Sequence, residues 1–112
     1  MCTSIGSLKR KVFEYGFARA EHISVRILRV EFIGNDALVL FGDVTGKIFS
    51  TVNREVFKKT NGDIEVGSVL LLEGVAGLLC LEEHPDIRRK VGSAYVHLSV
   101  QLENVAKVFP YY

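Results

Sequence analysis

The chain has 112 residues, of which 48% are hydrophobic and 24% are charged, a balance typical of one globular domain. Its 14 basic and 13 acidic side chains give a formal net charge of +1. This near-neutral charge excludes a uniformly positive protein, so a nucleic-acid site would have to be a local basic patch. The sequence has no apolar run near the roughly 20 residues that span a bilayer, and its start lacks the apolar core of a secretory signal.

The cysteines and histidines occur singly, as Cys2, Cys80, His22, His84 and His97. They do not form the closely spaced clusters that bind zinc, so we expect no metal or other cofactor. Both thiols are expected to be reduced, and Cys80 to be buried, as free cysteine commonly is. The sequence also lacks a G-x-x-x-x-G-K-[ST] phosphate loop and any residue order that suggests an acyl-transfer triad. We therefore expect a protein that is not an enzyme.

Residues 1–21 are expected to form a helical or irregular appendage in front of the main domain. Ser7 is a candidate helix cap. The basic run from Lys9 to Lys11 is interpreted as a solvent-exposed helix turn. The helix is expected to use one apolar face, which consists of Leu8, Val12 and Tyr15.

From His22 the hydrophobic period changes to two, which indicates a strand. A bulge near Leu28 is needed to turn its apolar residues inward, and this bulge leaves Arg26 and Arg29 outward. The residues expected to face inward are Val25, Ile27, Val30 and Phe32. A turn at 33–36 and a second strand at 37–42 follow.

The stretch DVTG, from Asp43 to Gly46, predicts a tight corner into a third strand. The Asp43 side chain can accept a hydrogen bond from the backbone two residues on, and Gly46 can take a positive φ. Asn53 is expected to cap a short helix at 54–59 that ends at Asn61 and Gly62. Two hydrophobic residues of that helix, Val56 and Phe57, are expected to plug one end of a barrel.

A fourth strand is expected from Gly67 to about Leu81, with bends at its interior glycines. The polar segment 82–92 is predicted to be a loop, and the last strand is predicted to run from Tyr95 to Phe109. Five strands with a short helix between the third and fourth predict an all-β fold over residues 22–112. This fold is the OB-fold, a Greek-key barrel that binds oligonucleotides or oligosaccharides.

Three blocks of the sequence carry a family resemblance. The first contains DVTGKI and TVNR between Asp43 and Arg54, and the second is VGSVLLL from Val66 to Leu72. The third runs from Leu98 to Phe109 and ends in an asparagine, two small apolar residues, a base, an apolar residue and an aromatic one. Over residues 23–109 the chain resembles replication-protein-A-like OB domains, most of all the homologous recombination OB-fold family.

This resemblance implies a module that binds single-stranded DNA in DNA repair and homologous recombination, together with a helicase of the minichromosome-maintenance type. It implies a nuclear protein, or a cytosolic one if the source is not a eukaryote. No catalytic residue is transferred, because the family module is not an enzyme.

A groove for single-stranded DNA needs cations for the phosphates and flat apolar faces for the bases. Lys47 and Phe49 lie on one face of the third strand, beside the outward arginines of the first. The alternative for Phe49 is packing against the N-terminal appendage, and for the loop cations below it is a solvated loop tip. The candidate nucleic-acid-binding residues are Arg26, Arg29, Lys47, Phe49, Arg88, Arg89, Lys90 and Tyr95.

Leu38 and Leu40 are expected to face outward if Val39 and Phe41 face inward. Exposed leucines in a row mark a covered surface, so either the N-terminal segment or another chain is expected to cover them. The alternative function is therefore a protein-interaction subunit of a replication-protein-A-like complex that binds little or no nucleic acid. The sequence does not decide between DNA and RNA.

Overall fold

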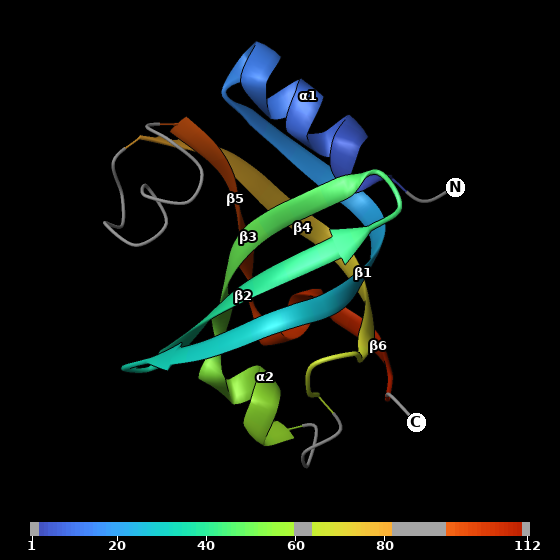
Figure 1. Ribbon diagram of the computed structural model, residues 1–112, viewed down its shortest axis with the longest axis vertical. Coiled ribbons are helices and arrows are strands. Elements are labelled where there is room, and N and C mark those ends of the chain that lie inside the picture. Colours follow the sequence, from blue (N-terminus) through green and yellow to red (C-terminus); the bar gives the residue numbers. More distant parts are fainter. Residues whose placement is uncertain (1–2, 60–63, 82–93, 111–112) are drawn as a thin grey trace.

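The computed structural model describes residues 3–59, 64–81 and 94–110 (Figure 1). The chain begins with helix α1 and then builds a set of strands that is interrupted by one short helix. The elements are α1 (Ile5–Tyr15), β1 (Phe17–Ile33), β2 (Asp36–Asp43), β3 (Gly46–Asn53), α2 (Arg54–Lys59), β4 (Val69–Leu81), β5 (Ala94–Val100), the 3-10 helix η1 (Leu102–Asn104) and β6 (Val105–Phe109).

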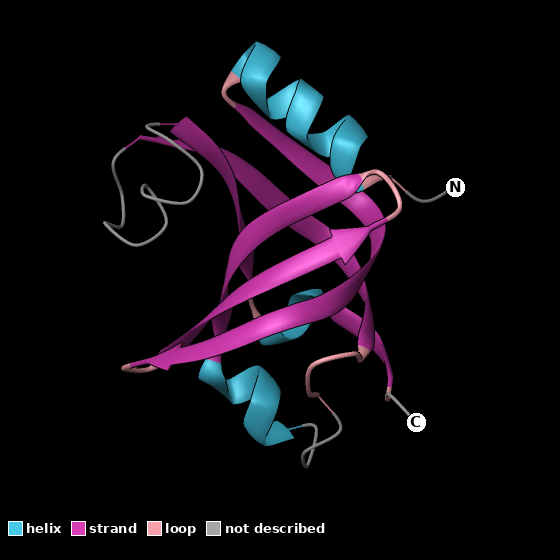
Figure 2. Ribbon diagram, viewed as in Figure 1, coloured by secondary structure: helices cyan, strands magenta, loops and turns pink. Residues whose placement is uncertain are grey.

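The strands close into a barrel in the order β1-β2-β3-β5-β4, because β4 also pairs with β1. Among the pairs formed by the described strands, β3 and β5 are parallel and all the others are antiparallel. Strand β1 has two partners: its first part pairs with β4 and its later part pairs with β2, and Arg26 pairs with both Val69 and Gly42. These pairings confirm the predicted five-stranded OB-fold barrel with its short helix after the third strand (Figure 2).

The bulge expected in the first strand is present. The register of β1 against β2 shifts between Ile27 and Arg29, so Leu28 is the extra residue. Arg26 and Arg29 are therefore both exposed while Ile27 is buried. The Leu28 side chain leans over Gly42, where an added Cβ would lie 2.7 Å from Leu28 Cδ1. Position 42 thus requires glycine as long as Leu28 keeps this place.

The core consists of the inward residues of all five barrel strands together with buried residues of α1 and α2. Ser50 is buried among them, and its hydroxyl donates to the Val39 carbonyl over 3.0 Å, which satisfies the polar group. The main buried side chains of the strands are Ile23, Val25, Ile27, Val39, Phe41, Ile48, Val52, Leu70, Leu72, Val96, Leu98 and Val100.

The inward prediction was wrong for Phe32, which is 52% exposed. It lies beyond the barrel end, where its ring packs edge-on against Phe57 with 5.1 Å between centroids. The Arg54 guanidinium lies 4.8 Å from the centroid of the Phe32 ring, within the range of a cation–π contact. Phe32 thus covers the base of α2 instead of filling the core.

Helix α2 begins as predicted. The Asn53 carboxamide oxygen accepts a hydrogen bond from the Glu55 N–H over 2.9 Å, as an N-cap does. Val56 is fully buried and Phe57 packs partly against the core. The expected end of the helix at residues 61 and 62 lies outside the described residues.

Helix α1 differs from its prediction at both ends. Ser4 is the cap instead of Ser7: its hydroxyl accepts from the Ser7 N–H over 3.1 Å. At the other end Gly16 takes a left-handed φ of 82°, and its N–H donates to the Val12 carbonyl. The chain therefore enters β1 at Phe17, earlier than His22. Tyr15 is 73% exposed because it lies at this end, and the buried face consists of Ile5, Leu8 and Val12.

The last strand is not continuous, as it was predicted to be. Asn104 splits it: its side-chain oxygen accepts from the Gln101 N–H over 2.8 Å, and its side-chain nitrogen donates to the Glu73 carbonyl over 3.0 Å. These bonds hold one turn of 3-10 helix between β5 and β6. Strand β6 then pairs with the beginning of β4, outside the closed ring of strands.

The DVTG corner joins β2 to β3 and also holds α1. Asp43 accepts from the Thr45 N–H (2.7 Å), from the Thr45 hydroxyl (2.6 Å) and from the Ile5 N–H of α1 (2.8 Å). The Thr45 hydroxyl accepts from the Gly6 N–H over 2.8 Å. Two N–H groups of the first turn of α1, which have no partner inside the helix, are thus satisfied by a hairpin that lies 38 and 39 residues further along.

Two opposing effects act on the Asp43 carboxyl group. Partial burial disfavours its charge, but hydrogen bonds from Ile5, Thr45 and Gly46 stabilise the carboxylate more strongly, so its pKa is lowered from the usual value. Asp43 is therefore ionised at neutral pH and serves as a charged cap for α1.

Candidate functional site

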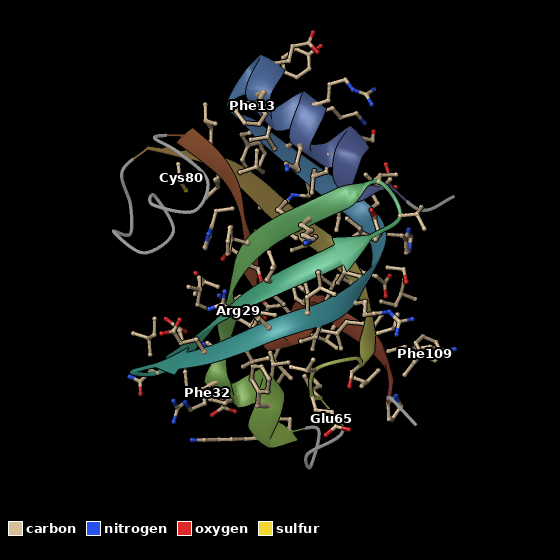
Figure 3. The ribbon with its side chains drawn as sticks, in the orientation of Figure 1. Phe13, Arg29, Phe32, Glu65, Cys80 and Phe109 are labelled. Atoms are coloured by element: carbon tan, nitrogen blue, oxygen red, sulfur yellow. The ribbon has the colours of Figure 1, made fainter. Side chains whose placement is uncertain are left out.

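One row of outward side chains crosses four strands of the barrel. Arg29 of β1 pairs with Leu40 of β2, Leu40 with Phe49 of β3, and Phe49 with His97 of β5. Their inward neighbours along each strand are buried, apart from Val30, which is partly buried against the core, so these four project from the outer surface. We call them the cross-strand row; Arg29 is labelled in Figure 3.

A second row lies beside it. Leu38 of β2 pairs with Thr51 of β3, and Thr51 pairs with Ser99 of β5. The Thr51 hydroxyl lies within hydrogen-bond distance, 2.5 Å, of His97 Nε2. This contact ties the imidazole ring to the parallel pairing of β3 and β5 and fixes its position next to Phe49.

A groove of about 530 Å³ opens where β1 changes its partner from β4 to β2. Arg26 and Lys47 lie on its walls, and Arg26 Nη1 donates to the Gly67 carbonyl over 3.2 Å. This bond restrains the arginine next to the apolar wall. We call this feature the Arg26–Lys47 groove; its other lining residues are Ser24, Val25, Leu28, Gly42, Asp43, Val44 and Val69.

The structure brings together four of the residues that the sequence indicated for nucleic-acid binding. Arg26 and Lys47 share the groove, whereas Arg29 and Phe49 belong to the cross-strand row. The two features are continuous, because Lys47 and Phe49 lie two residues apart on the same face of β3, and Arg26 and Arg29 flank the bulge of β1.

The other predicted residues are only partly described. Tyr95 belongs to β5, where its backbone pairs with Cys80, and its side chain is outside the description. Arg88, Arg89 and Lys90 lie outside the described residues, so their predicted contact stays a prediction.

Leu38 and Leu40 face outward, as their parity predicted, and both are half-buried. Within the described ranges, α1 packs mainly against β1, β3, β4 and β5. Figure 1 shows it at one end of the barrel, away from the middle of β2. The N-terminal helix is therefore not the cover of these two leucines, and they belong to the same surface as Phe49.

His97 completes the row. The alternation of the last strand predicts that it faces outward beside Tyr95, but its place next to Phe49 could not be predicted, because the two meet only through the parallel register of β3 and β5. The apolar groove residues Leu28 and Val44 were missed too. The bulge at Leu28 was the one available signal for them, since bulges redirect side chains.

The electrostatics of this face are simple. Arg26, Arg29 and Lys47 are exposed cations on it, and the carboxylate of Asp43 is engaged by the corner and by α1. The described part of the chain contains no group of three or more histidine, cysteine or acidic side chains that could hold a metal ion. Cys80 is half-buried, whereas full burial was expected. No helix in the described ranges is long and apolar enough to cross a membrane.

Comparison with solved structures supports the fold. The chain is similar to asparaginyl-tRNA synthetase from Pyrococcus horikoshii, with a TM-score of 0.53 and 16% identity over 98% of this chain and 22% of that one. It is also similar to aspartyl tRNA synthetase from Entamoeba histolytica, with a TM-score of 0.47 and 18% identity over 77% of this chain and 18% of that one. The chain thus spans about a fifth of the length of these enzymes. At 16% identity the likeness to the first of these structures shows the fold alone.

Comparison by sequence is more specific. No curated protein sequence matches the chain. The model of one family, described as homologous recombination OB-fold protein, matches residues 18–111. This match covers most of the chain and all of the barrel strands apart from Phe17, the first residue of β1. The chain therefore belongs to the homologous recombination OB-fold family.

Proposed function

We propose that this protein is a single-stranded DNA-binding OB-fold module that acts in DNA repair by homologous recombination. The observation that carries the proposal is the cross-strand row together with the Arg26–Lys47 groove. The two features gather three cations and two rings on one face of a molecule whose formal net charge is only +1. The family match supports recombination as the setting.

The chemistry of this face suits a single strand. Phe49 and His97 offer adjacent rings for base stacking, which contributes about 1–3 kcal/mol per base. Arg29 lies at one end of the row and Lys47 lies two residues before Phe49, about 7 Å away along β3. Phosphates can therefore be bound on both sides of the stacked bases. Leu40, in the middle of the row, gives the bases an apolar floor.

The remaining parts of the proposal follow from the family. We propose that the bound strand is passed to or from a helicase of the minichromosome-maintenance type, that the module itself binds without catalysing a reaction, and that it works in the nucleus, or in the cytosol of a non-eukaryotic source. These proposals are tested by recovery of the helicase with the protein and by its position in the cell.

The binding test uses fluorescence anisotropy of a labelled DNA strand of about 20 nucleotides, longer than the roughly 4–16 nucleotides that one OB-fold covers. We expect binding that weakens steeply with salt, since phosphate contacts release counterions. Phe49→Ala is expected to weaken it about tenfold, the loss of one good base stack, and Lys47→Glu is expected to lower the salt dependence.

The matched control is Lys58→Glu with Lys59→Glu. Both lysines are exposed on α2, at the opposite end of the barrel from α1 (Figure 1). An equal loss in this control would mean that overall charge, and not this face, determines binding. Absence of binding by the unaltered protein even at low salt would refute the proposal, and a competing RNA strand of the same sequence separates DNA from RNA.

A second candidate function is a protein-interaction subunit, and the outward, half-buried Leu38 and Leu40 favour it. A hydrophobic partner surface would cover them. The test is Leu40→Glu, which is expected to abolish self-association or capture of a partner while the melting temperature is unchanged. A strictly monomeric protein that recovers no partner would argue against this function.

A further inference from the structure

The helix α1 is held rigidly at the edge of the proposed binding face. Asp43 and Thr45 of the corner accept hydrogen bonds from its first turn. Lys9 Nζ donates to the Lys47 carbonyl over 3.1 Å. Lys47 lines the Arg26–Lys47 groove, so the side of α1 that carries Lys9 borders this groove and β3. An ammonium has three donors, and among the residues that the structure describes Lys9 uses one of them in this bond.

An exposed aromatic ring lies on the same side of the helix. Phe13 follows Lys9 by one turn, so the two are neighbours on the helix surface. Phe13 is 54% exposed, and in Figure 3 it lies toward the end of α1 that is nearer to β5. Helix α1 also contacts β3 and β5 directly. A base and a ring thus stand beside the strands that carry Phe49 and His97.

The cross-strand row also continues toward α1. His97 pairs with Leu78 of β4, and Leu78 pairs with Phe17, the first residue of β1. Leu78 and Phe17 are both exposed, and only Gly16 separates Phe17 from the end of α1. Outward side chains, two aromatic, one aliphatic and one imidazole, therefore line up from Phe49 through His97 and Leu78 to Phe17 at the end of the helix.

We propose that α1 is a second segment of the nucleic-acid path: a strand bound on the cross-strand row continues along this helix, where Lys9 binds a phosphate and Phe13 stacks a base. This inference rests on the proposed function. The 11 residues of α1 add a path of about 16 Å at 1.5 Å per residue. The length of this path and the order of its residues suit a single strand, because such a strand needs alternating cationic and aromatic contacts along a continuous surface.

The helix supplies its own matched control. Lys11 and Tyr15 are also a base and an aromatic residue four positions apart, and both are exposed. Two residues correspond to about 200° around a helix, so this pair lies on the other side of α1, away from Lys9. We therefore compare Lys9→Gln with Phe13→Ser against Lys11→Gln with Tyr15→Ser, in the full chain.

The readout is anisotropy with the same DNA strand of about 20 nucleotides over a range of salt concentrations. The Lys9 and Phe13 variant is expected to bind about tenfold more weakly, as for one lost base stack. Its salt slope is expected to fall by about 0.7, the value for one phosphate of a single strand. The control variant is expected to bind as the unaltered protein does. Melting temperatures verify that both fold, and Arg10→Glu, an exposed substitution on α1, gives a further test of the helix.

Three results would overturn the inference. If Phe49→Ala loses affinity while the Lys9 and Phe13 variant does not, the proposed function holds and the role of α1 is refuted. If both α1 variants lose affinity equally, the helix acts through unspecific charge. If the unaltered protein binds no strand, the proposed function fails and the path along α1 fails with it.

Discussion

The strongest structural prediction concerns Asp43. Replacement by alanine removes the acceptor of hydrogen bonds from the Ile5 N–H, the Thr45 N–H and the Thr45 hydroxyl. The N-cap Ser4 stays in place in this variant, but a buried donor left without a partner costs about 1–3 kcal/mol. Ile5 is fully buried, so this cost applies to its N–H. We expect Asp43→Ala to lower the free energy of unfolding by about 2 kcal/mol.

The assay is urea denaturation at neutral pH, with hydrogen exchange to locate the change. The midpoint should fall without a change in the m-value, and the amides of α1 should lose protection before those of β2 and β3. The control is Asp36→Ala, an exposed aspartate at the beginning of β2, which should change stability little. A loss below about 0.5 kcal/mol in Asp43→Ala, the usual size of a surface effect, would refute the view that this corner holds the helix.

Three further predictions follow from the same contacts. Hydrogen bonds lower the pKa of Asp43 below its value in the unfolded chain. The stability that Asp43 contributes is therefore fully present above the unfolded pKa and is lost as pH falls through the lowered, folded pKa. In urea denaturation, the difference in stability between the unaltered protein and Asp43→Asn should shrink below about pH 4. Gly42→Ala should cost only about 0.5–1.5 kcal/mol, because the added Cβ displaces the end of the flexible, half-buried Leu28 side chain from its rotamer. In a double-mutant cycle the cost of Gly42→Ala should be smaller when Leu28 is already alanine, and equal costs in the two backgrounds would contradict this. Charge reversal at Arg88 and Arg89 should weaken DNA binding and flatten its salt dependence in anisotropy, and unchanged affinity would exclude the predicted loop contact.

Local pattern predicted the barrel and much of its outer face. The alternation of β2 and β3 correctly assigned Val39 and Phe41 to the core and Leu40 and Phe49 to the surface. The bulge at Leu28 followed from the break in period two, and it placed Arg26 outward. These successes share one cause, which is that strand parity is a property of neighbouring residues.

Features that depend on distant contacts could not be predicted. His97 joins Phe49 through a parallel pairing that no nearby residue specifies. The last strand breaks at Asn104 because its side chain reaches the carbonyl of Glu73, 31 residues earlier. Phe32 has the parity of a core residue but lies past the end of the barrel. In each case the partner is far away in the sequence, and the local pattern carries no information about it.

The divided pairing of β1 has a consequence for how the protein folds during synthesis. The later part of β1 finds its partner at once in β2, across a tight turn, but Phe17 must wait for Leu78. On the ribosome the hairpins of β1, β2 and β3 can therefore form early, while the first part of β1 stays without its partner strand until β4 has emerged. Closure of the barrel over so long a sequence separation should limit the refolding rate. Leu72→Ala, a core change in β4, should therefore slow folding in stopped-flow measurements and change the unfolding rate little, because its contacts form in the rate-limiting step.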